Sequence, residues 1–457
     1  MTSPAQTTAP PTRFVGYLAC IAGFLLCVTA FYPGYISPDS IRQLTEGRAW
    51  SFTDWHPPLM AAVWGLIDRV IPGPFGMLLL QNAVFWTGLA FFWRATYRKS
   101  VWLGLCLVTV GFLPTTLALL STIWKDVGLG VSLLLAAALL HTARRTGSKV
   151  VLLASVPMLF YGYGVRHNAA PAILPLTLWS GVIAMQIFRP RRDKPTGMRT
   201  MLPVVAGLAY FMLLTAAVVA TTGILTGGRS TYIAQAVLLH DLTAISKEKG
   251  EAMYPDYITK GEGFSLANAT AHYRPDYAPE VFRGEDSPVH LTEDPQELAA
   301  LRTKWLKVVP ANMSIYIRHR WETCKWVTGW GKEELCQPYL ATSHSFGGYD
   351  VNHWRVHTLL KAVFWKLRNS FFFRGIFWLL TSLALLCAAV AVRLKGDMET
   401  VFVLSLSGLL YGAGYFFYTL ACDFRFLWWT ALAALVGLCF TAWFAVERWR
   451  ISHPAAK

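Results

Sequence analysis

Three aspartates lie at the ends of long apolar runs, and each has a cation close by in the sequence. They are Asp39, Asp126 and Asp423. A carboxylate can accept a proton from a hydroxyl group. Arg, Lys and protonated His can hold a phosphate and stabilise the negative charge that develops on it. Side chains of these types, gathered at a membrane surface, would suit the transfer of a group carried on a lipid phosphate.

These aspartates belong to a larger set of boundary charges. The set is Asp39, Arg42, Glu46, Arg48, Asp54, His56, Asp68, Arg69, Lys125, Asp126, Arg166, His167, Asp423 and Arg425. Ionisable groups near lipid are costly to keep and often mark a site. We take Asp39 as the first candidate for a catalytic base and Asp126 as the second. The candidates for binding the phosphate or the substrates are His56, Lys125, Arg166, His167, Asp423 and Arg425.

Each of these boundary charges also has a purely structural interpretation. Ser37-Pro38-Asp39-Ser40 is a good helix start, with a serine cap, a proline in the first turn and an acid that favours the helix dipole. Lys125 can extend its ammonium group toward water, and Asp126 can cap the next helix. Arg166 and His167 can end a helix at the surface, and Asp423 and Arg425 can pair across a hairpin. The gathering of all of them at one boundary favours the functional interpretation.

The elements that would position these groups are membrane-spanning helices. The chain has 457 residues, of which 54% are hydrophobic and 15% charged. Its apolar runs have the length of about 20 residues that is needed to cross a bilayer. The net charge of +15 comes from short basic clusters between the runs, such as Arg144 and Arg145. Clusters of this kind mark cytoplasmic loops, and the sequence lacks the basic groove with aromatic residues typical of nucleic-acid binding.

The pattern predicts an all-α polytopic membrane protein with about ten crossings. They are residues 14–36, 75–93, 101–122, 127–143, 150–165, 169–188, 201–223, 371–392, 400–420 and 426–446. The apolar run 59–71 is too short to span and is expected to lie at the interface. The first run could also be a secretory signal, although an uncleaved helix is preferred because it tethers the Asp39 segment.

Three regions follow from this topology. Residues 1–223 form a membrane bundle of about seven helices with a first outer loop at 37–74, and residues 371–457 add about three helices. Residues 224–370 are expected to form a mainly helical extracytoplasmic domain, with helices over 232–245 and 305–330. This segment has 17 Lys and Arg against 16 Asp and Glu, so it is nearly neutral. Residues 354–373 are expected to lie along the membrane surface.

Two of the eight cysteines, Cys324 and Cys336, fall in the domain 224–370. In an oxidising compartment such a pair can form a disulfide, although two unrelated thiols are the alternative. The other cysteines show no metal-like spacing, and no Gly-rich phosphate loop is visible. We therefore expect no metal and no cofactor.

The chain resembles the GT-C membrane glycosyltransferases. The likeness rests on Asp39 after the first helix, on His-Pro-Pro-Leu at 56–59 and on the charged turn at Lys125-Asp126. It is nearest to bacterial relatives of the family of protein O-mannosyltransferases and lipid A aminoarabinose transferase. The segments Leu239–Leu242 and Asp423–Phe426 are also similar to bacterial members. The chain differs from the usual pattern in having a single Asp at 39 instead of a pair of acids.

The resemblance and the boundary charges together lead to one functional expectation. The protein would transfer a sugar from a polyprenyl-phosphate donor to an extracytoplasmic acceptor, with inversion, at the inner membrane of a bacterium. Its partners would be the membrane lipid, the lipid-linked donor and an acceptor that is a glycan, lipid or protein, with no nucleic acid. The alternatives are a polymerase or ligase that uses a lipid-diphosphate-linked glycan, and a transporter or flippase of lipid-linked sugars.

Overall fold

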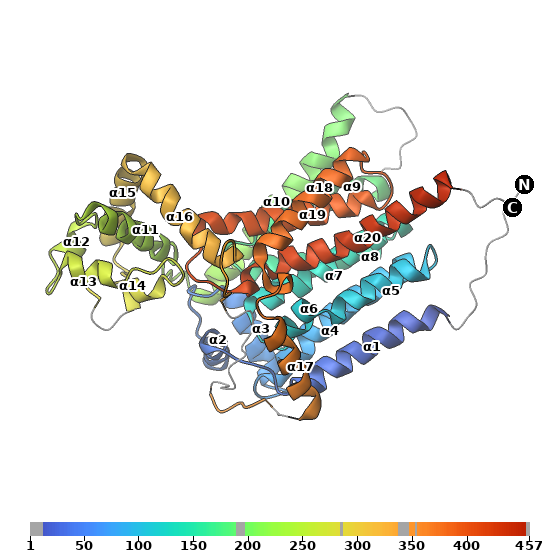
Figure 1. Ribbon diagram of the computed structural model, residues 1–457, viewed down its shortest axis with the longest axis horizontal. Helices are drawn as coiled ribbons and strands as arrows, with labels where there is room; N and C mark the ends of the chain where they lie inside the picture. Colours follow the sequence, from blue (N-terminus) through green and yellow to red (C-terminus); the bar gives the residue numbers. More distant parts are fainter. Residues whose placement is uncertain (1–11, 189–196, 284–286, 337–346, 352–353, 454–457) are drawn as a thin grey trace, which may run out of the picture.

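The structure is a computed structural model that describes residues 12–188, 197–283, 287–336, 347–351 and 354–453. These residues form helices, and the extended segments among them meet in two isolated bridges. Figure 1 shows a bundle of long helices with both chain termini near one end and the shorter helices α11–α16 at the other. The fold is therefore all-helical, as the sequence predicts.

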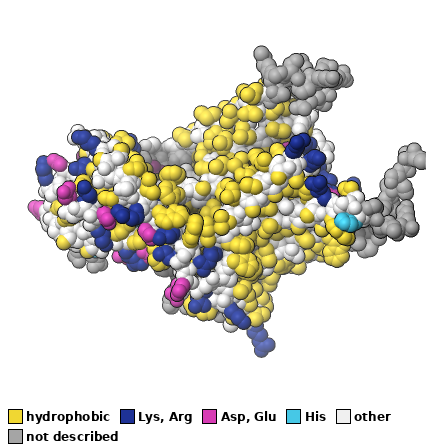
Figure 2. Space-filling model, turned by 45° about the horizontal axis from the view of Figure 1, so that its top comes forward, with side chains coloured by type: hydrophobic (Ala, Val, Ile, Leu, Met, Phe, Trp, Pro, Cys, Tyr) yellow, Lys and Arg dark blue, Asp and Glu magenta, His cyan; other side chains and the backbone are white. Residues whose placement is uncertain are grey.

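Seven helices are long and apolar enough to cross a membrane. They are α1 (Thr12–Ala30), α4 (Phe75–Thr96), α7 (Lys125–Thr146), α9 (Ala170–Phe188), α10 (Gly197–Thr226), α19 (Met398–Tyr418) and α20 (Trp428–Ser452). Figure 2 shows a broad apolar surface over the bundle, Lys and Arg near the termini, and mixed charges over the short helices. These features indicate a multi-pass membrane protein.

Two more helices of the bundle are apolar but shorter than a full crossing. They are α8 (Lys149–Gly164), with 16 residues, and α18 (Gly375–Ala391), with 17. Every predicted crossing therefore overlaps helical structure, although α1 ends at Ala30, before the predicted end of the crossing 14–36. The total of ten crossings stays a prediction, because the lengths support seven, or eight with one bent pair.

The predicted crossing at 101–122 is wrong as a single helix. It consists of α5 (Val101–Thr109), the short 3₁₀ turn η1 (Val110–Phe112) and α6 (Pro114–Leu120), with a bend of 52° at the break. Pro114 cannot donate a backbone hydrogen bond, so the helix is interrupted there. The Trp428 indole donates to the Thr115 carbonyl at 3.0 Å. The interrupted backbone is thus partly satisfied by a neighbouring helix, as a nonpolar environment requires.

Helix α7 is the centre of the bundle. Its apolar window is completely buried, and its 22 residues extend over about 33 Å. At its C-terminal end Arg144 pairs with Glu399 at 3.1 Å and Arg145 with Asp397 at 3.2 Å. Lys99 also pairs with Asp397, at 3.1 Å. The basic ends of α4 and α7 and the start of α19 therefore lie on one side, as predicted, while Arg189, Arg191, Arg192 and Lys194 lie outside the described residues.

The first loop contains two short helices, α2 (Pro38–Ala49) and α3 (Pro58–Asp68). With 11 residues α3 is too short to span, which agrees with the predicted interfacial helix. The two helices cross at Gly47 and Gly65. A Cβ atom on either glycine would lie within 2.5 Å of a backbone oxygen of the other helix. Glycine at both positions allows this close crossing.

The short helices after α10 form what we call the side domain. They are α11 (Ala234–Lys249), α12 (Asp256–Thr259), α13 (Leu266–Ala271), α14 (Pro279–Arg283), α15 (Pro295–Ala311) and α16 (Met313–Thr328). Buried Leu239, Leu242 and Leu301 belong to its core, and Trp55 of the first loop packs against that core. The predicted helix 305–330 is in fact two helices, with a break at Asn312.

The chain returns to the bundle through α17 (Arg355–Leu367) and the 3₁₀ turn η2 (Phe371–Phe373). Helix α17 is amphipathic, with Leu359 exposed and Phe364 buried. Trp354 donates to the Thr29 carbonyl at the end of α1, and His357 contacts the Tyr35 hydroxyl. This geometry fits a helix that lies along the membrane surface beside the first loop.

The predicted disulfide between Cys324 and Cys336 is wrong. Cys336 is bonded to Cys422, 86 residues further along the chain, and Cys324 on α16 is a free thiol. The segment after α16 contacts the start of α18, where Arg374 donates to the Gly329 and Lys332 carbonyls, and the disulfide attaches it to the connection between α19 and α20. The bond therefore joins the end of the side domain directly to the turn that contains Asp423.

Candidate functional site

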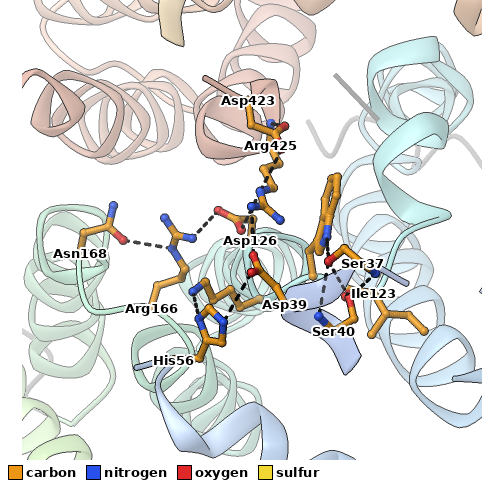
Figure 3. Close-up of polar contacts among 12 residues, drawn as sticks. Ser37, Asp39, Ser40, His56, Ile123, Asp126, Arg166, Asn168, Asp423 and Arg425 are labelled. Atoms are coloured by element: carbon orange, nitrogen blue, oxygen red, sulfur yellow. Dashed lines mark hydrogen bonds and ion pairs between the residues drawn. The ribbon is translucent and has the colours of Figure 1, made fainter. Parts of the chain in front are cut away.

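The segment before α2 is held against the segment before α7 by backbone and side-chain hydrogen bonds. The Tyr35 amide donates to the Ser121 carbonyl, and the Ile123 amide donates to the Tyr35 carbonyl, both at 2.9 Å. The Ser40 hydroxyl donates to the Ile123 carbonyl at 2.7 Å. These contacts bring the N-termini of α2 and α7 together, and with them Asp39 and Lys125-Asp126 (Figure 3).

The cap of α2 is Ser37. Its side chain accepts from the Ser40 amide, and the Ser40 side chain accepts from the Ser37 amide in return, which makes a complete capping box. The Trp124 indole donates to the same Ser37 hydroxyl at 2.9 Å. The carboxylate of Asp39 is therefore not needed to cap the helix, and it points toward charged groups instead.

Asp39 lies between a guanidinium and an imidazole. Arg425 Nη2 is 3.1 Å from Asp39 Oδ2, and His56 Nε2 is 3.6 Å from Oδ1. Burial alone would raise the pKa of Asp39, but the charges of Arg425 and Lys125 and the hydrogen bond from Arg425 outweigh it and hold the pKa well below its usual value. The Asp39 side chain is still 35% exposed. Asp39 is thus an ionised carboxylate that a substrate can reach.

His56 connects Asp39 to Lys125. The Lys125 Nζ atom lies 2.6 Å from His56 Nδ1. Burial and the neighbouring Lys125 lower the pKa of His56 well below its ordinary value, so the imidazole is neutral at pH 7. An ammonium group can only donate, so Nδ1 accepts and the ring proton lies on Nε2, facing Asp39. Lys125, His56 and Asp39 thus lie in a row, with a hydrogen bond between Lys125 and His56 and a 3.6 Å contact between His56 and Asp39.

Asp126 and Arg166 form a buried ion pair behind Asp39. The atoms Arg166 Nη1 and Asp126 Oδ1 are 2.9 Å apart, and the two side chains are 9% and 1% exposed. The remaining guanidinium nitrogens of Arg166 donate to the Tyr415 hydroxyl at 2.6 Å and to Asn168 Oδ1 at 3.1 Å. With each nitrogen already engaged, Arg166 is better placed to fix Asp126 than to bind a ligand.

Arg425 is shared among three carboxylates. Besides Asp39, its Nε atom lies 3.1 Å from Asp423 Oδ2 and 3.9 Å from Asp126 Oδ2. Its guanidinium also lies over the Trp124 ring, 4.4 Å from the centroid. Burial raises the pKa of Asp423 to about 6, although Arg425 opposes the rise. We call Asp39, His56, Lys125, Asp126, Arg166, Asp423 and Arg425 the Asp39 cluster.

His167 is the one predicted site residue with no direct contact to the Asp39 cluster among the contacts of the described residues. Its Nε2 atom lies 2.9 Å from the backbone carbonyl of Asp54. It lines a separate cavity of about 180 Å³ together with Tyr232 and Arg302 of the side-domain region. The structure therefore brings seven of the eight predicted site residues together. His167 follows Arg166 in the sequence but its side chain faces the separate cavity.

Some contributing residues were missed from the sequence. Tyr415 and Asn168 hold Arg166, and Trp124 packs under Arg425. Trp124 and Asn168 adjoin charged turns in the sequence, whereas Tyr415 lies within α19 and has no such signal. Conversely, the Leu239–Leu242 segment is not part of the site, because Asp241 pairs with Arg320 at 2.7 Å and His319 at 3.2 Å in a fully buried core.

Comparison with protein-family models, with curated proteins and with solved structures finds no match to this chain. The chemistry of the site is therefore argued from its geometry. Among the described residues, no group of three or more His, Cys, Asp and Glu side chains is arranged to hold a metal ion. What the site contains is a reachable carboxylate bordered by an ammonium, an imidazole and a guanidinium. Such a set can accept a proton on one side and stabilise an anion on the other.

Proposed function

We propose that the protein is a glycosyltransferase that moves a sugar from a polyprenyl-phosphate donor to an acceptor hydroxyl at the extracytoplasmic face of a bacterial inner membrane. The observation that carries this proposal is the position of Asp39. Its partly exposed carboxylate lies beside Arg425 and His56, at the end of a bundle of apolar helices. A base in direct contact with an anion-binding group suits a displacement reaction in which a phosphate is the leaving group.

In the proposed reaction Asp39 accepts the proton of the acceptor hydroxyl. The hydroxyl oxygen forms a bond to the anomeric carbon, and the bond from that carbon to the phosphate oxygen breaks. The sugar is transferred with inversion, and the polyprenyl phosphate leaves as an anion. Lys125 and Arg425 stabilise that anion. His56 lies between Lys125 and Asp39 and contacts both through its two ring nitrogens.

The low pKa of Asp39 fits this sequence of events. A carboxylate whose pKa is low is a weak base, so the free enzyme holds Asp39 in an inactive ion pair. A donor phosphate that binds Arg425 would compete with Asp39 for the same guanidinium. Loss of that partner raises the basicity of Asp39 when the donor is in place. Asp126, held by Arg166, lies 3.9 Å from Arg425 and helps to keep that guanidinium beside Asp39.

One observation favours a second candidate, a polymerase or ligase that uses a diphosphate-linked donor. Arg42 and Arg283 both lie over the Trp55 ring, at 5.8 Å and 4.8 Å from its centroid. Arg283 belongs to the side domain and Trp55 precedes His56, so a second phosphate could reach these cations. The two candidates differ in their donor, which makes them separable by assay.

The test is a transfer assay with the purified full-length protein. Polyprenyl-monophosphate and polyprenyl-diphosphate sugars would be supplied with a membrane extract as a source of acceptors, and transfer of labelled sugar would be measured. Asp39→Asn should fold normally, because Ser37 caps α2, yet lose at least about 10²-fold in rate. Near-normal transfer by Asp39→Asn would remove Asp39 as the base. Transfer from the diphosphate donors alone would favour the second candidate.

A further inference from the structure

A small cavity lies where the first loop, the turn between α8 and α9, and the side domain meet. Its volume is about 180 Å³, and its polar lining includes His167, Tyr232 and Arg302. Leu238, Leu298 and Leu301 supply an apolar wall. A second cavity of about 340 Å³ shares Tyr232, Leu298 and Arg302 with it. Both spaces are thus lined by Tyr232, before α11, and by the N-terminal half of α15.

Hydrogen bonds to Asp54 hold one edge of this cavity in place. The Asp54 carboxylate accepts hydrogen bonds from the hydroxyls of Ser230 and Thr231, both at 2.6 Å, and from the Thr231 amide at 2.5 Å. These bonds fix the next residue, Tyr232, with a φ of +49°. A bulky residue in this left-handed region is rare, and such conformations cluster at functional sites. The chain therefore uses Asp54 to hold Tyr232 at the cavity in a costly conformation.

The cavity also offers unused hydrogen-bonding groups. His167 Nε2 faces the Asp54 carbonyl, so it carries the ring proton and Nδ1 is an acceptor. Among the hydrogen bonds of the described residues, none uses His167 Nδ1 or the Arg302 guanidinium. The lining thus combines an acceptor, a multiple donor and a tyrosine with an apolar wall. This mixture matches a saccharide, which has apolar ring faces and hydroxyl groups around its edge.

The cavity adjoins the Asp39 cluster through two pieces of chain. Asp54 and His56 are two residues apart in a bent segment, so their Cα atoms are at most about 7 Å apart. Asp54 faces the cavity, whereas His56 faces Asp39. Likewise His167 lines the cavity, while the preceding Arg166 pairs with Asp126. A ligand in the cavity would therefore lie close to Asp39, on the side of the side domain.

We propose that this cavity is the acceptor site and that it binds a saccharide whose hydroxyl group is presented to Asp39. The identification of the ligand as the acceptor rests on the proposed function. In this proposal the lipid of the donor lies along the membrane bundle, whereas the cavity is lined by residues of α11 and α15, which lie with the other short helices at one end of the molecule (Figure 1). An acceptor glycan that arrives from water would thus meet the lipid-linked donor at Asp39.

Saccharide binding can be tested without turnover. The full-length protein would be titrated with a panel of methyl glycosides of pentoses, hexoses and 2-acetamido hexoses, and binding would be followed by saturation-transfer NMR. Ala234 is exposed at the start of α11 and lines the cavity. Ala234→Trp should fill the space and weaken binding at least tenfold. The matched control is Ala300→Trp, because Ala300 is equally exposed on α15 but lines neither cavity.

Two further variants keep the test decisive. Arg302→Gln changes an exposed side chain that should not affect folding, and it should weaken binding about tenfold through the loss of a charged donor. The matched control Lys307→Gln removes an exposed cation of α15 that lines neither cavity, so it should bind glycosides like the wild type. The proposal is overturned if no glycoside of the panel binds, or if Ala234→Trp and Arg302→Gln both bind normally. Glycoside binding without transfer from any donor would refute the proposed function and leave a saccharide site.

Discussion

At the scale of single residues, the competition for Arg425 governs the site. Three carboxylates surround its guanidinium, namely Asp39, Asp126 and Asp423. Arg166 and Lys125 supply the further positive charge that three neighbouring carboxylates need, so an anion that binds Arg425 must displace one of its partners. The partly exposed Asp39 can be displaced by an incoming phosphate, whereas the buried Asp126 cannot leave. Arg425 is therefore the residue through which donor binding would activate the base.

Protonation of Asp423 provides a pH test of this arrangement. Burial raises its pKa to about 6, so it loses its charge, and its ion pair with Arg425, as the pH falls through 6. Turnover should therefore decrease on acidification, with a midpoint near pH 6. In Asp423→Asn this limb should be absent and the rate lower throughout. A wild-type limb that persists in Asp423→Asn would assign the titration to another group.

The same pKa predicts the opposite effect on stability. The pKa of Asp423 rises from 3.8 to about 6 on folding, so the folded protein binds more protons between these values. The contribution of Asp423 to stability therefore decreases as the pH rises from about 4 to 6. The ionised form of Asp423 therefore lowers the stability of the fold, although it is the form that pairs with Arg425.

Arg166 and Arg425 should respond differently to replacement by alanine. Arg166→Ala leaves Asp126 buried without its closest partner, which typically costs about 3–5 kcal/mol of stability. Arg425→Ala removes a group at the reachable edge of the site and should cost about 10²–10³ in turnover. Thermal unfolding and transfer rates measured on both variants would check this division. An Arg166→Ala protein that is stable but inactive would instead indicate that Arg166 binds the donor phosphate.

Most of the site could be predicted from residue type and position. Charged side chains at the ends of apolar runs have few inexpensive places to lie, so their gathering at one boundary follows from the membrane itself. The sequence does not predict which of these side chains pair with one another and which face a substrate. The pairing of Asp126 with Arg166, and the binding of His167 to Asp54, depend on side-chain directions that spacing does not encode.

At the scale of elements, helices were predictable and their interruptions and long-range contacts were not. Apolar run length predicts α4 and α7 well. The break at Leu113–Pro114 depends on a hydrogen bond from the distant Trp428 indole to the Thr115 carbonyl, which run length cannot predict. The disulfide shows a related error. Cys336 was paired with the cysteine nearest in sequence, although the predicted topology also placed Cys422 at the outer boundary, beside Asp423.

The bond between Cys336 and Cys422 should position the Asp423–Arg425 turn. Its closed loop of 86 residues corresponds to about 4–5 kcal/mol in the chain-entropy model. Mass spectrometry of non-reduced peptides should link these two cysteines and find Cys324 alkylated. Cys336→Ser should lower the unfolding temperature and slow transfer, whereas the control Cys324→Ser should do neither. A linked Cys324 would contradict the structure at this point.

At the scale of the whole molecule, α7 connects two ends with different chemistry. One end holds Arg144 and Arg145 in ion pairs with the start of α19, and the other holds Lys125 and Asp126 in the Asp39 cluster. The disulfide Cys336–Cys422 lies at the Asp39 end. Disulfides persist in oxidising compartments, and basic clusters stay in the cytoplasm. Both rules independently predict that the Asp39 cluster lies on the extracytoplasmic side.

This orientation can be tested with reporter fusions. Gly147 follows the basic end of α7, and Lys395 lies in the connection between α18 and α19, so fusions at both should report the cytoplasm. Gly261 lies in the side domain between α12 and α13, and a fusion there should report the outside. Alkylation of single cysteines at the same positions by a membrane-impermeant reagent is the control. If Gly261 proves cytoplasmic, the Asp39 cluster faces the cytoplasm with it, because the disulfide and the contacts of Trp55 with the side domain join the two. An extracytoplasmic lipid-linked donor would then be out of reach.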